Sequence, residues 1–183
     1  MNYNAMNLFL SEENIKKHLE HTKRMKLKLS ILCKSFADLN STSIKDVLHS
    51  NIDAEAKKEA VELLWYIKSH ELFFDSFTET PRKSDVLLKQ YSSQEKFLYD
   101  LYLSVKDVTS AFLFVYTDQK GFVRYSVSKK YDGEFLRINP LLAIDLFEHT
   151  YFWDYGFEKE KFLRAALTHL DLSRLSGSVA VNA

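Results

Sequence analysis

The segment from residue 144 to residue 156 reads IDLFEHTYFWDYG. It sets a carboxylate, Asp145, four residues before an imidazole, His149, among mostly apolar and aromatic neighbours. Two more histidines stand far upstream, His18 within KKHLEH and His70 within KSHELFF. Three imidazoles and one carboxylate suit iron or manganese, whereas zinc accepts the same donors but cannot change its oxidation state.

These three segments resemble the iron/manganese superoxide dismutase family. Its metal ligands are a histidine in the first helix, a histidine in the second helix ahead of an aromatic run, and the Asp and His of a D-x-W-E-H-A-Y-Y segment. The likeness extends from about Tyr3 to Leu175, nearly the whole chain. It implies an α+β fold, in which an N-terminal helical hairpin precedes a C-terminal α/β domain with a three-stranded antiparallel sheet.

The resemblance also implies a substrate, superoxide, and one iron or manganese ion per chain, held by His18, His70, Asp145 and His149. Taken singly, each histidine is more often a core or surface residue than a ligand. Asp145 with His149 is as readily a charged pair at the end of a strand. Their joint occurrence in the family's order favours a metal site. His21 lies one turn after His18, and the resemblance makes it a bystander.

The residues themselves predict helices in the N-terminal half. Ser11 before two glutamates starts a helix, because a hydroxyl accepts from free backbone amides and acidic residues suit the positive end of the helix dipole. Apolar residues recur at helical spacing to about Lys34, with a break or kink expected near Thr22. A short helix around Ile44–Leu48 and a second long helix over about Asp53–Phe77 follow.

The character of the chain changes after TETPRKSD, residues 78–85, where Pro81 lacks an amide donor. We therefore expect two domains, residues 1–80 and 81–183. The second contains aromatic and β-branched runs that are typical of strands. Its expected elements are two short helices, three strands and a final helix, at about 85–90, 93–108, 110–116, 122–128, 141–146 and 158–175.

The composition is that of an ordinary globular protein and names no partner. The 25 Lys and Arg residues balance the 25 Asp and Glu residues, so we expect neither nucleic acid nor an anionic membrane as a partner. Only 4 Gly and 2 Pro residues occur, which favours long helices over turn-rich β-structure. Cys33 is the only cysteine, which excludes an internal disulfide and a cysteine-based zinc site.

The expected cellular compartment is inferred from the absence of targeting and membrane segments in the sequence. No stretch approaches the roughly 18 apolar residues of a membrane span. The start of the chain has neither a secretory signal nor an Arg-rich presequence. We expect a cytoplasmic protein, or a mitochondrial one without a recognisable presequence.

Several positions depart from the family's pattern around the metal. The family has a gating Tyr eight residues after the first ligand and a His four residues after it, where this chain has Lys26 and Thr22. The Tyr three residues after the last ligand is Phe152. These changes predict a weakened proton relay. Lys26 is either a cation that attracts superoxide at the mouth of the substrate funnel or part of a solvated helix face.

Two tyrosines are candidates for a further role at the site. The family's glutamine that hydrogen-bonds the metal-bound solvent comes from the second helix or from the sheet, at positions that correspond to about Tyr66 and Tyr131. A tyrosine hydroxyl can donate a hydrogen bond as an amide does. The alternative is that both side chains only pack.

Glu148 predicts an assembly. In the family, the Glu beside the last His ligand reaches the corresponding His of the other subunit, which fixes the ring of that ligand. We therefore expect a homodimer through Glu148 and His149. The alternative is a solvated carboxylate at the start of a helix.

Two functions fit the sequence. The first is a superoxide dismutase-like enzyme with a weakened proton relay, in which Tyr66, Tyr131 and Lys26 are candidate catalytic residues. The second is a structural subunit that keeps the fold within a larger assembly, such as a mitochondrial ribosome or respiratory complex, with little or no catalysis. The four intact ligand positions favour the enzyme.

Overall fold

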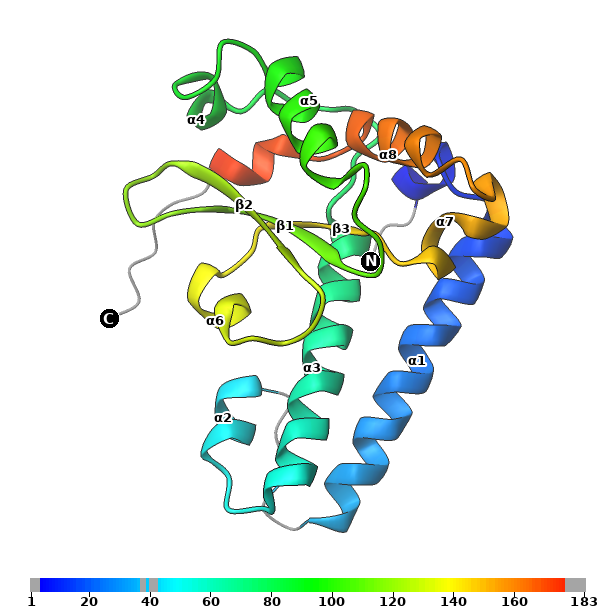
Figure 1. Cartoon of the computed structure of the whole chain (residues 1–183), viewed down its shortest axis with the longest axis vertical. Coiled ribbons are helices and arrows are strands. Elements are labelled where there is room, and N and C mark those ends of the chain that lie inside the picture. Colours follow the sequence, from blue (N-terminus) through cyan, green and yellow to red (C-terminus); the bar gives the residue numbers. More distant parts are fainter. Residues whose placement is uncertain (1–3, 37–38, 40–42, 177–183) are drawn as a thin grey trace.

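The computed structural model describes residues 4–36, 39 and 43–176 and has the predicted α+β architecture (Figure 1). Two long helices, α1 (Glu12–Ser35) and α3 (Ala54–Asp75), run side by side and project from a sheet. The short helix α2 (Ile44–His49) packs against α3. None of the described helices combines the length and the apolar composition that a membrane crossing requires.

Helix α1 begins as the sequence predicts. The hydroxyl of Ser11 accepts from the amide of Asn14 at 3.2 Å, which satisfies one of the free donors at the helix start. The expected break near Thr22 is absent, and the helix continues to Ser35. The Thr22 hydroxyl donates to the carbonyl of His18 one turn earlier, at 3.1 Å, so its polar group is satisfied within the helix.

The C-terminal half surrounds a sheet of three strands, β1 (Phe112–Thr117), β2 (Val123–Ser128) and β3 (Leu142–Asp145). The strand order is β2-β1-β3, with both pairs antiparallel. Helices α4 (Asp85–Leu88), α5 (Gln94–Val105) and α8 (Lys159–Thr168) lie above the sheet in Figure 1. Two short 3-10 helices lie near the ends of the described chain, η1 (Asn4–Leu8) and η2 (Leu172–Ser176). The remaining elements are α6 (Glu134–Ile138) and α7 (Glu148–Tyr155).

The central strand β1 is buried on both faces and anchors α3. Phe112 and Phe114 point to one face, where their ring centroids lie 5.5 and 6.4 Å from the ring centroid of Trp65 on α3. Leu113 and Val115 point to the other face and are also buried, because successive side chains of a strand alternate. The aromatic contact fixes the position of α3 against the sheet.

The end of the chain differs from the predicted helix over 158–175. Helix α8 stops at Thr168, and Leu170 then forms an isolated antiparallel bridge with Phe77. The amide of Thr78 donates to the carbonyl of His169 at 2.9 Å. Pairing with the segment after α3 therefore replaces the last helical turns, which helical periodicity alone could not indicate.

Ser76 joins the end of α3 to the edge strand β3. Its hydroxyl accepts from the amide of Ala143 at 2.8 Å and donates to the carbonyl of Leu72 at 2.6 Å. Ser76 is fully buried, and an edge strand otherwise leaves backbone donors unpaired. One serine therefore links the helix that carries His70 to the strand that carries Asp145.

Replacing Ser76 tests this link. We expect Ser76→Ala to lower the free energy of unfolding by about 1 to 3 kcal/mol, because the buried amide of Ala143 loses its acceptor. The measurement is denaturant unfolding. The matched control is Ser35→Ala, since Ser35 also donates to a carbonyl one turn earlier but is exposed. Equal effects of the two substitutions would contradict the link.

Candidate metal centre

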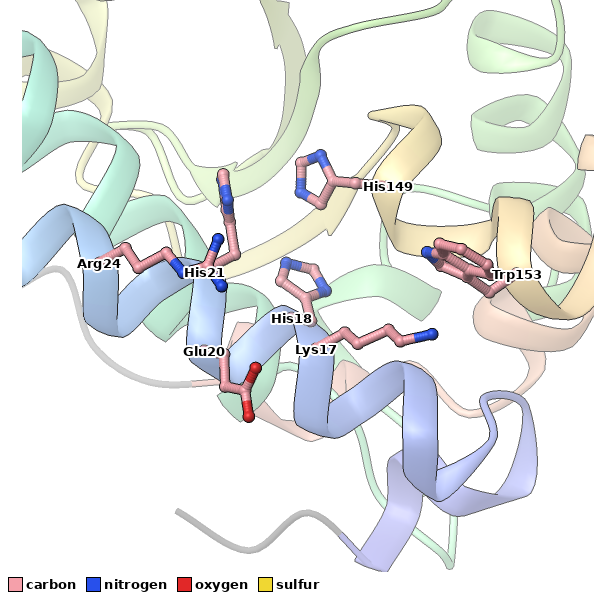
Figure 2. Close-up of a pocket in the computed structure, with 7 residues that line it drawn as sticks. All are labelled: Lys17, His18, Glu20, His21, Arg24, His149 and Trp153. Atoms are coloured by element: carbon pink, nitrogen blue, oxygen red, sulfur yellow. The ribbon is translucent and has the colours of Figure 1, made fainter.

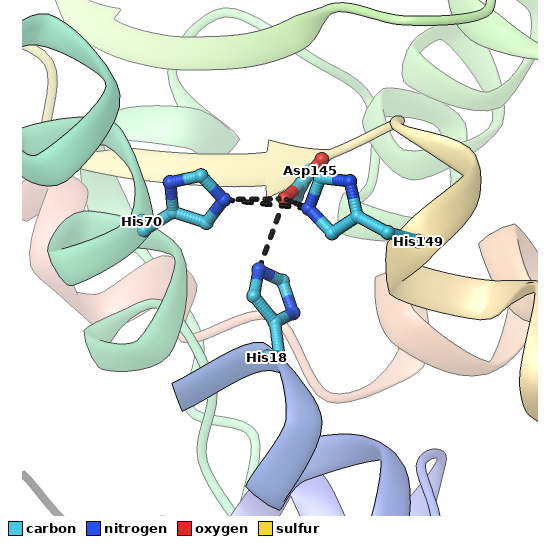
Figure 3. A group of neighbouring side chains, drawn as sticks. All are labelled: His18, His70, Asp145 and His149. Atoms are coloured by element: carbon cyan, nitrogen blue, oxygen red, sulfur yellow. Dashed lines mark hydrogen bonds and ion pairs between the residues drawn. The ribbon is translucent and has the colours of Figure 1, made fainter. Parts of the chain in front are cut away.

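Four side chains from four elements converge on one point (Figure 3). One lies in the second turn of α1, one near the end of α3, one at the end of β3 and one at the start of α7. Their potential ligand atoms all lie within 4.8 Å of one another. They are His18, His70, Asp145 and His149, the four residues that the sequence proposed.

The carboxylate of Asp145 is the centre of the group. Its Oδ2 lies 3.2, 3.3 and 3.4 Å from Nε2 of His18, His70 and His149. Its Oδ1 accepts from the amide of Phe147 at 2.9 Å, which fixes the orientation of the carboxylate. Asp145 has no exposed surface, so its charge has to be balanced from within this group.

The charge states of the group suit a cation. Burial alone would raise the pKa of Asp145, but its contacts with the three imidazoles hold that pKa well below the ordinary value. Burial lowers the pKa of His18 to about 4. At neutral pH the carboxylate is therefore charged and His18 is neutral. These are the forms that bind a metal ion.

The hydrogen bonds of the group leave possible metal-ligand atoms free at the centre. Nδ1 of His70 donates to the carbonyl of Tyr66, with a separation of 2.7 Å, which turns the lone pair of Nε2 inward. His18 Nε2 and Asp145 Oδ2 are buried and, within the described residues, not aligned for a hydrogen bond. Buried polar atoms without a hydrogen bond are rare in proteins, and a metal ion between these two atoms, which lie 3.2 Å apart, would satisfy both. The residues therefore fit the metal that their chemistry suggests.

Phenylalanine rings form the wall around the imidazoles. The ring centroid of His18 lies 5.3 and 5.1 Å from the ring centroids of Phe73 and Phe74. His149 stacks on Phe147 at 5.6 Å. Phe112, which pairs in register with Asp145, lies 5.2 Å from His70. This apolar wall holds the rings in place and limits the access of water.

Of the two tyrosines that the sequence singled out, Tyr66 lies beside the centre. Its ring stacks on His70, with centroids 6.2 Å apart, and contacts Phe147 at 5.7 Å. Burial, and then the charge of Asp145, raise the pKa of Tyr66. The phenol therefore keeps its proton at neutral pH and can donate it in a hydrogen bond.

Tyr131 lies elsewhere. It lines a groove with Lys57, Val61 and Glu62 in the first half of α3. Even Glu62 precedes His70 by eight residues, which is about 12 Å along a helix. The structure thus brings Tyr66, but not Tyr131, to the candidate ligands.

The three altered relay positions are occupied by groups with other roles. Lys26 forms an ion pair with Glu71 on α3 at 2.7 Å, so it connects the two long helices. The hydroxyl of Thr22 donates a hydrogen bond to the carbonyl of His18. Phe152 is 45% exposed.

A pocket of about 230 Å³ opens onto the centre beside α1 (Figure 2). His21, which we expected to be a bystander, lines it. The His21 ring lies 4.8 Å from that of His149 and 5.7 Å from that of His70. The signal in the sequence was the spacing of three residues from His18, which places both on one helix face. The lining is Lys17, His18, Glu20, His21, Arg24, His149 and Trp153.

Comparison with known families agrees with this geometry. Residues 80–177 match the family model described as "Iron/manganese superoxide dismutases, C-terminal domain". The match covers more than half of the chain, so the protein belongs to this family. It begins within the predicted junction at residues 78–85 and contains Asp145 and His149, whereas His18 and His70 precede it. A search of curated proteins found no match.

Removing His70 tests the centre. Protein produced with iron and manganese supplied should carry about one ion per chain. We expect His70→Ala to reduce this content to near zero, because the site loses one nitrogen ligand whose ring is oriented by a backbone carbonyl. Elemental analysis of the purified protein is the measurement. The control is His49→Ala, since His49 is exposed on α2 and should be neutral. Stoichiometric metal in His70→Ala would rule out the assignment.

Proposed function

We propose that this protein is a metal-dependent superoxide dismutase with one iron or manganese ion per chain. The observation that carries the proposal is the convergence of three imidazole Nε2 atoms on one oxygen of a buried carboxylate, in a member of the superoxide dismutase family. The reaction converts two superoxide ions and two protons into oxygen and hydrogen peroxide. When bound, the metal supplies a cycle between two adjacent oxidation states. The proposed ligands are His18, His70, Asp145 and His149.

The protein residues have separate tasks in this proposal. Asp145 supplies one negative charge, which partly offsets the charge of the cation. The carbonyl of Tyr66 orients His70, and the phenol of Tyr66 is a candidate donor to a bound solvent. With a domain boundary at residue 80, as we propose, each domain supplies two ligands, so the metal would join them.

The proton supply is the weak part of the proposed enzyme. Lys26 is paired with Glu71, and the hydroxyl of Thr22 donates to its own helix. Phe152 has no group that could pass a proton. Catalysis should therefore be limited by protonation of the reduced product rather than by metal binding.

Rebuilding these positions tests the proposal. We expect Thr22→His, Lys26→Tyr and Phe152→Tyr together to raise superoxide turnover, since a positioned proton donor contributes roughly 10²- to 10⁴-fold. Turnover is followed by pulse radiolysis at equal metal content. Lys23→Tyr, on the exposed side of α1, controls for a tyrosine added elsewhere.

Two outcomes would count against this account. Near-diffusional turnover by the unmodified protein would refute the weakened relay. A filled metal site with no turnover, before or after rebuilding, would refute the enzyme. It would favour the alternative of a structural subunit in a larger assembly.

We also propose a homodimer through Glu148 and His149. Within the described part of the chain, no residue accepts a hydrogen bond from Nδ1 of His149, although a histidine ligand usually donates from this atom. Glu148 is exposed beside it. On the same side, Phe152 and Phe157 are 45% and 95% exposed. A second copy would cover these rings and bring Glu148 of the partner subunit to His149.

The dimer leads to a separate prediction. Glu148→Ala should weaken metal affinity about 10- to 100-fold, because His149 loses the acceptor that orients its ring. Metal affinity is measured by competition with a chelator, and assembly by analytical ultracentrifugation. Glu59→Ala, at an exposed position of α3, is the matched control. A monomeric protein, or equal affinities of the two variants, would show that Glu148 has no such role.

A further inference from the structure

His21 lies as close to the candidate ligands as they lie to one another. Its ring centroid is 4.8 Å from that of His149 and 5.7 Å from that of His70. The ring centroids of the three candidate histidine ligands are separated by 4.9, 5.0 and 5.7 Å. In Figure 2 the side chain of His21 rises from α1 towards His149. The imidazole of His21 therefore borders the open side of the centre.

This position is beside the ligand group and not within it. The nitrogen atoms of His21 are not part of the set that could share one ion. Neither nitrogen is hydrogen-bonded to another residue in the part of the chain that the structure describes. The ring is half-buried at the pocket. A neutral imidazole has one N–H donor, and here that donor is available to a small molecule in the pocket.

Two other cations of α1 are already engaged, and the carboxylate of Glu20 also lines the pocket. The ammonium of Lys17 lies 2.7 Å from the carboxylate of Glu13 and 3.7 Å from the ring centroid of Trp153. Lys26 is paired with Glu71. Arg24 follows His21 by three residues and also lines the pocket, so α1 presents a metal ligand, an imidazole and a guanidinium along one face.

We propose that His21 is an anion-binding residue of this centre. Its N–H donates a hydrogen bond to a small inorganic anion in the pocket, and Arg24, one turn further out, attracts that anion by its charge. If the proposed dismutase function holds, the anion is superoxide; the binding of an anion at His21 does not depend on that function. His21 then supplies a polar contact in a chain whose Lys26, Thr22 and Phe152 are directed elsewhere or carry no donor.

The test is a titration of the metal-loaded protein with sodium azide, a stable small monoanion, followed by the absorption and electron paramagnetic resonance spectra of the metal. We expect His21→Ala to weaken azide binding roughly 10- to 100-fold, the value of one hydrogen bond to a charged group. His21→Gln should retain much of the affinity, because its amide also donates. Metal content should be unchanged in both variants. His49→Ala is the matched control.

Arg24→Gln separates attraction from contact. It should weaken azide binding at low ionic strength, and the difference from the unmodified protein should shrink as salt is added, because salt screens an exposed charge. The effect of His21→Ala should persist at high salt. A salt-independent effect of Arg24→Gln would contradict the role given to its charge.

The remaining outcomes distinguish the two proposals. Equal azide affinity of His21→Ala and the unmodified protein would overturn the role of His21, and so would loss of metal from His21→Ala, which would make it a ligand. An unmodified protein that binds azide through His21 but does not turn over superoxide would refute the dismutase proposal and leave the role of His21 intact. A protein that takes up no metal would refute both.

Discussion

A buried carboxylate is the constraint on which the rest of this structure depends. Asp145 has no exposed surface, and an isolated charge in a protein interior costs several kcal/mol of free energy. Three imidazoles surround it at 3.2 to 3.4 Å. These contacts offset part of that cost, and a cation between the four groups would offset more. The arrangement is therefore one that a bound cation would stabilise.

The contacts between elements serve this convergence. Ser76 holds the end of α3 to β3, and with it His70 to Asp145. The side-chain amide of Asn14 donates at 2.9 Å to both the carbonyl of Thr150 and the carboxylate of Asp154, which ties the first turn of α1 to α7. This contact fixes the position of His18 relative to His149. Polar contacts of this kind, between segments far apart in the sequence, determine the geometry of the centre.

The sequence predicted the long helices, the three strands and the four candidate ligands because each leaves a local signal. Ser11 before two glutamates marks a helix start, and IDLFEHTYFWDYG is long enough to be distinctive. Helix α6 was missed, since Glu134–Ile138 is too short to show a period. The break after Thr168 was missed because its cause is pairing with Phe77, a residue more than ninety positions away.

The surroundings of the centre were less predictable than its four candidate ligands. Tyr131 stands in an irregular segment before α6 and lines a groove with residues of α2 and α3, a position that its neighbours in the sequence do not indicate. Lys26 was a candidate for the substrate channel, but its partner Glu71 lies on another helix. His21 could have been found from its spacing to His18. The role proposed for His21 depends on the positions of His70 and His149, which are defined only in the folded chain.

The most direct test of the account is the anomalous scattering of crystals of the manganese- or iron-loaded protein, recorded at the absorption edge of the metal. We expect one strong peak per chain, within coordination distance of Nε2 of His18, His70 and His149 and of an oxygen of Asp145, with His21 outside that distance. A peak elsewhere, or none at this point in metal-loaded crystals, would contradict it.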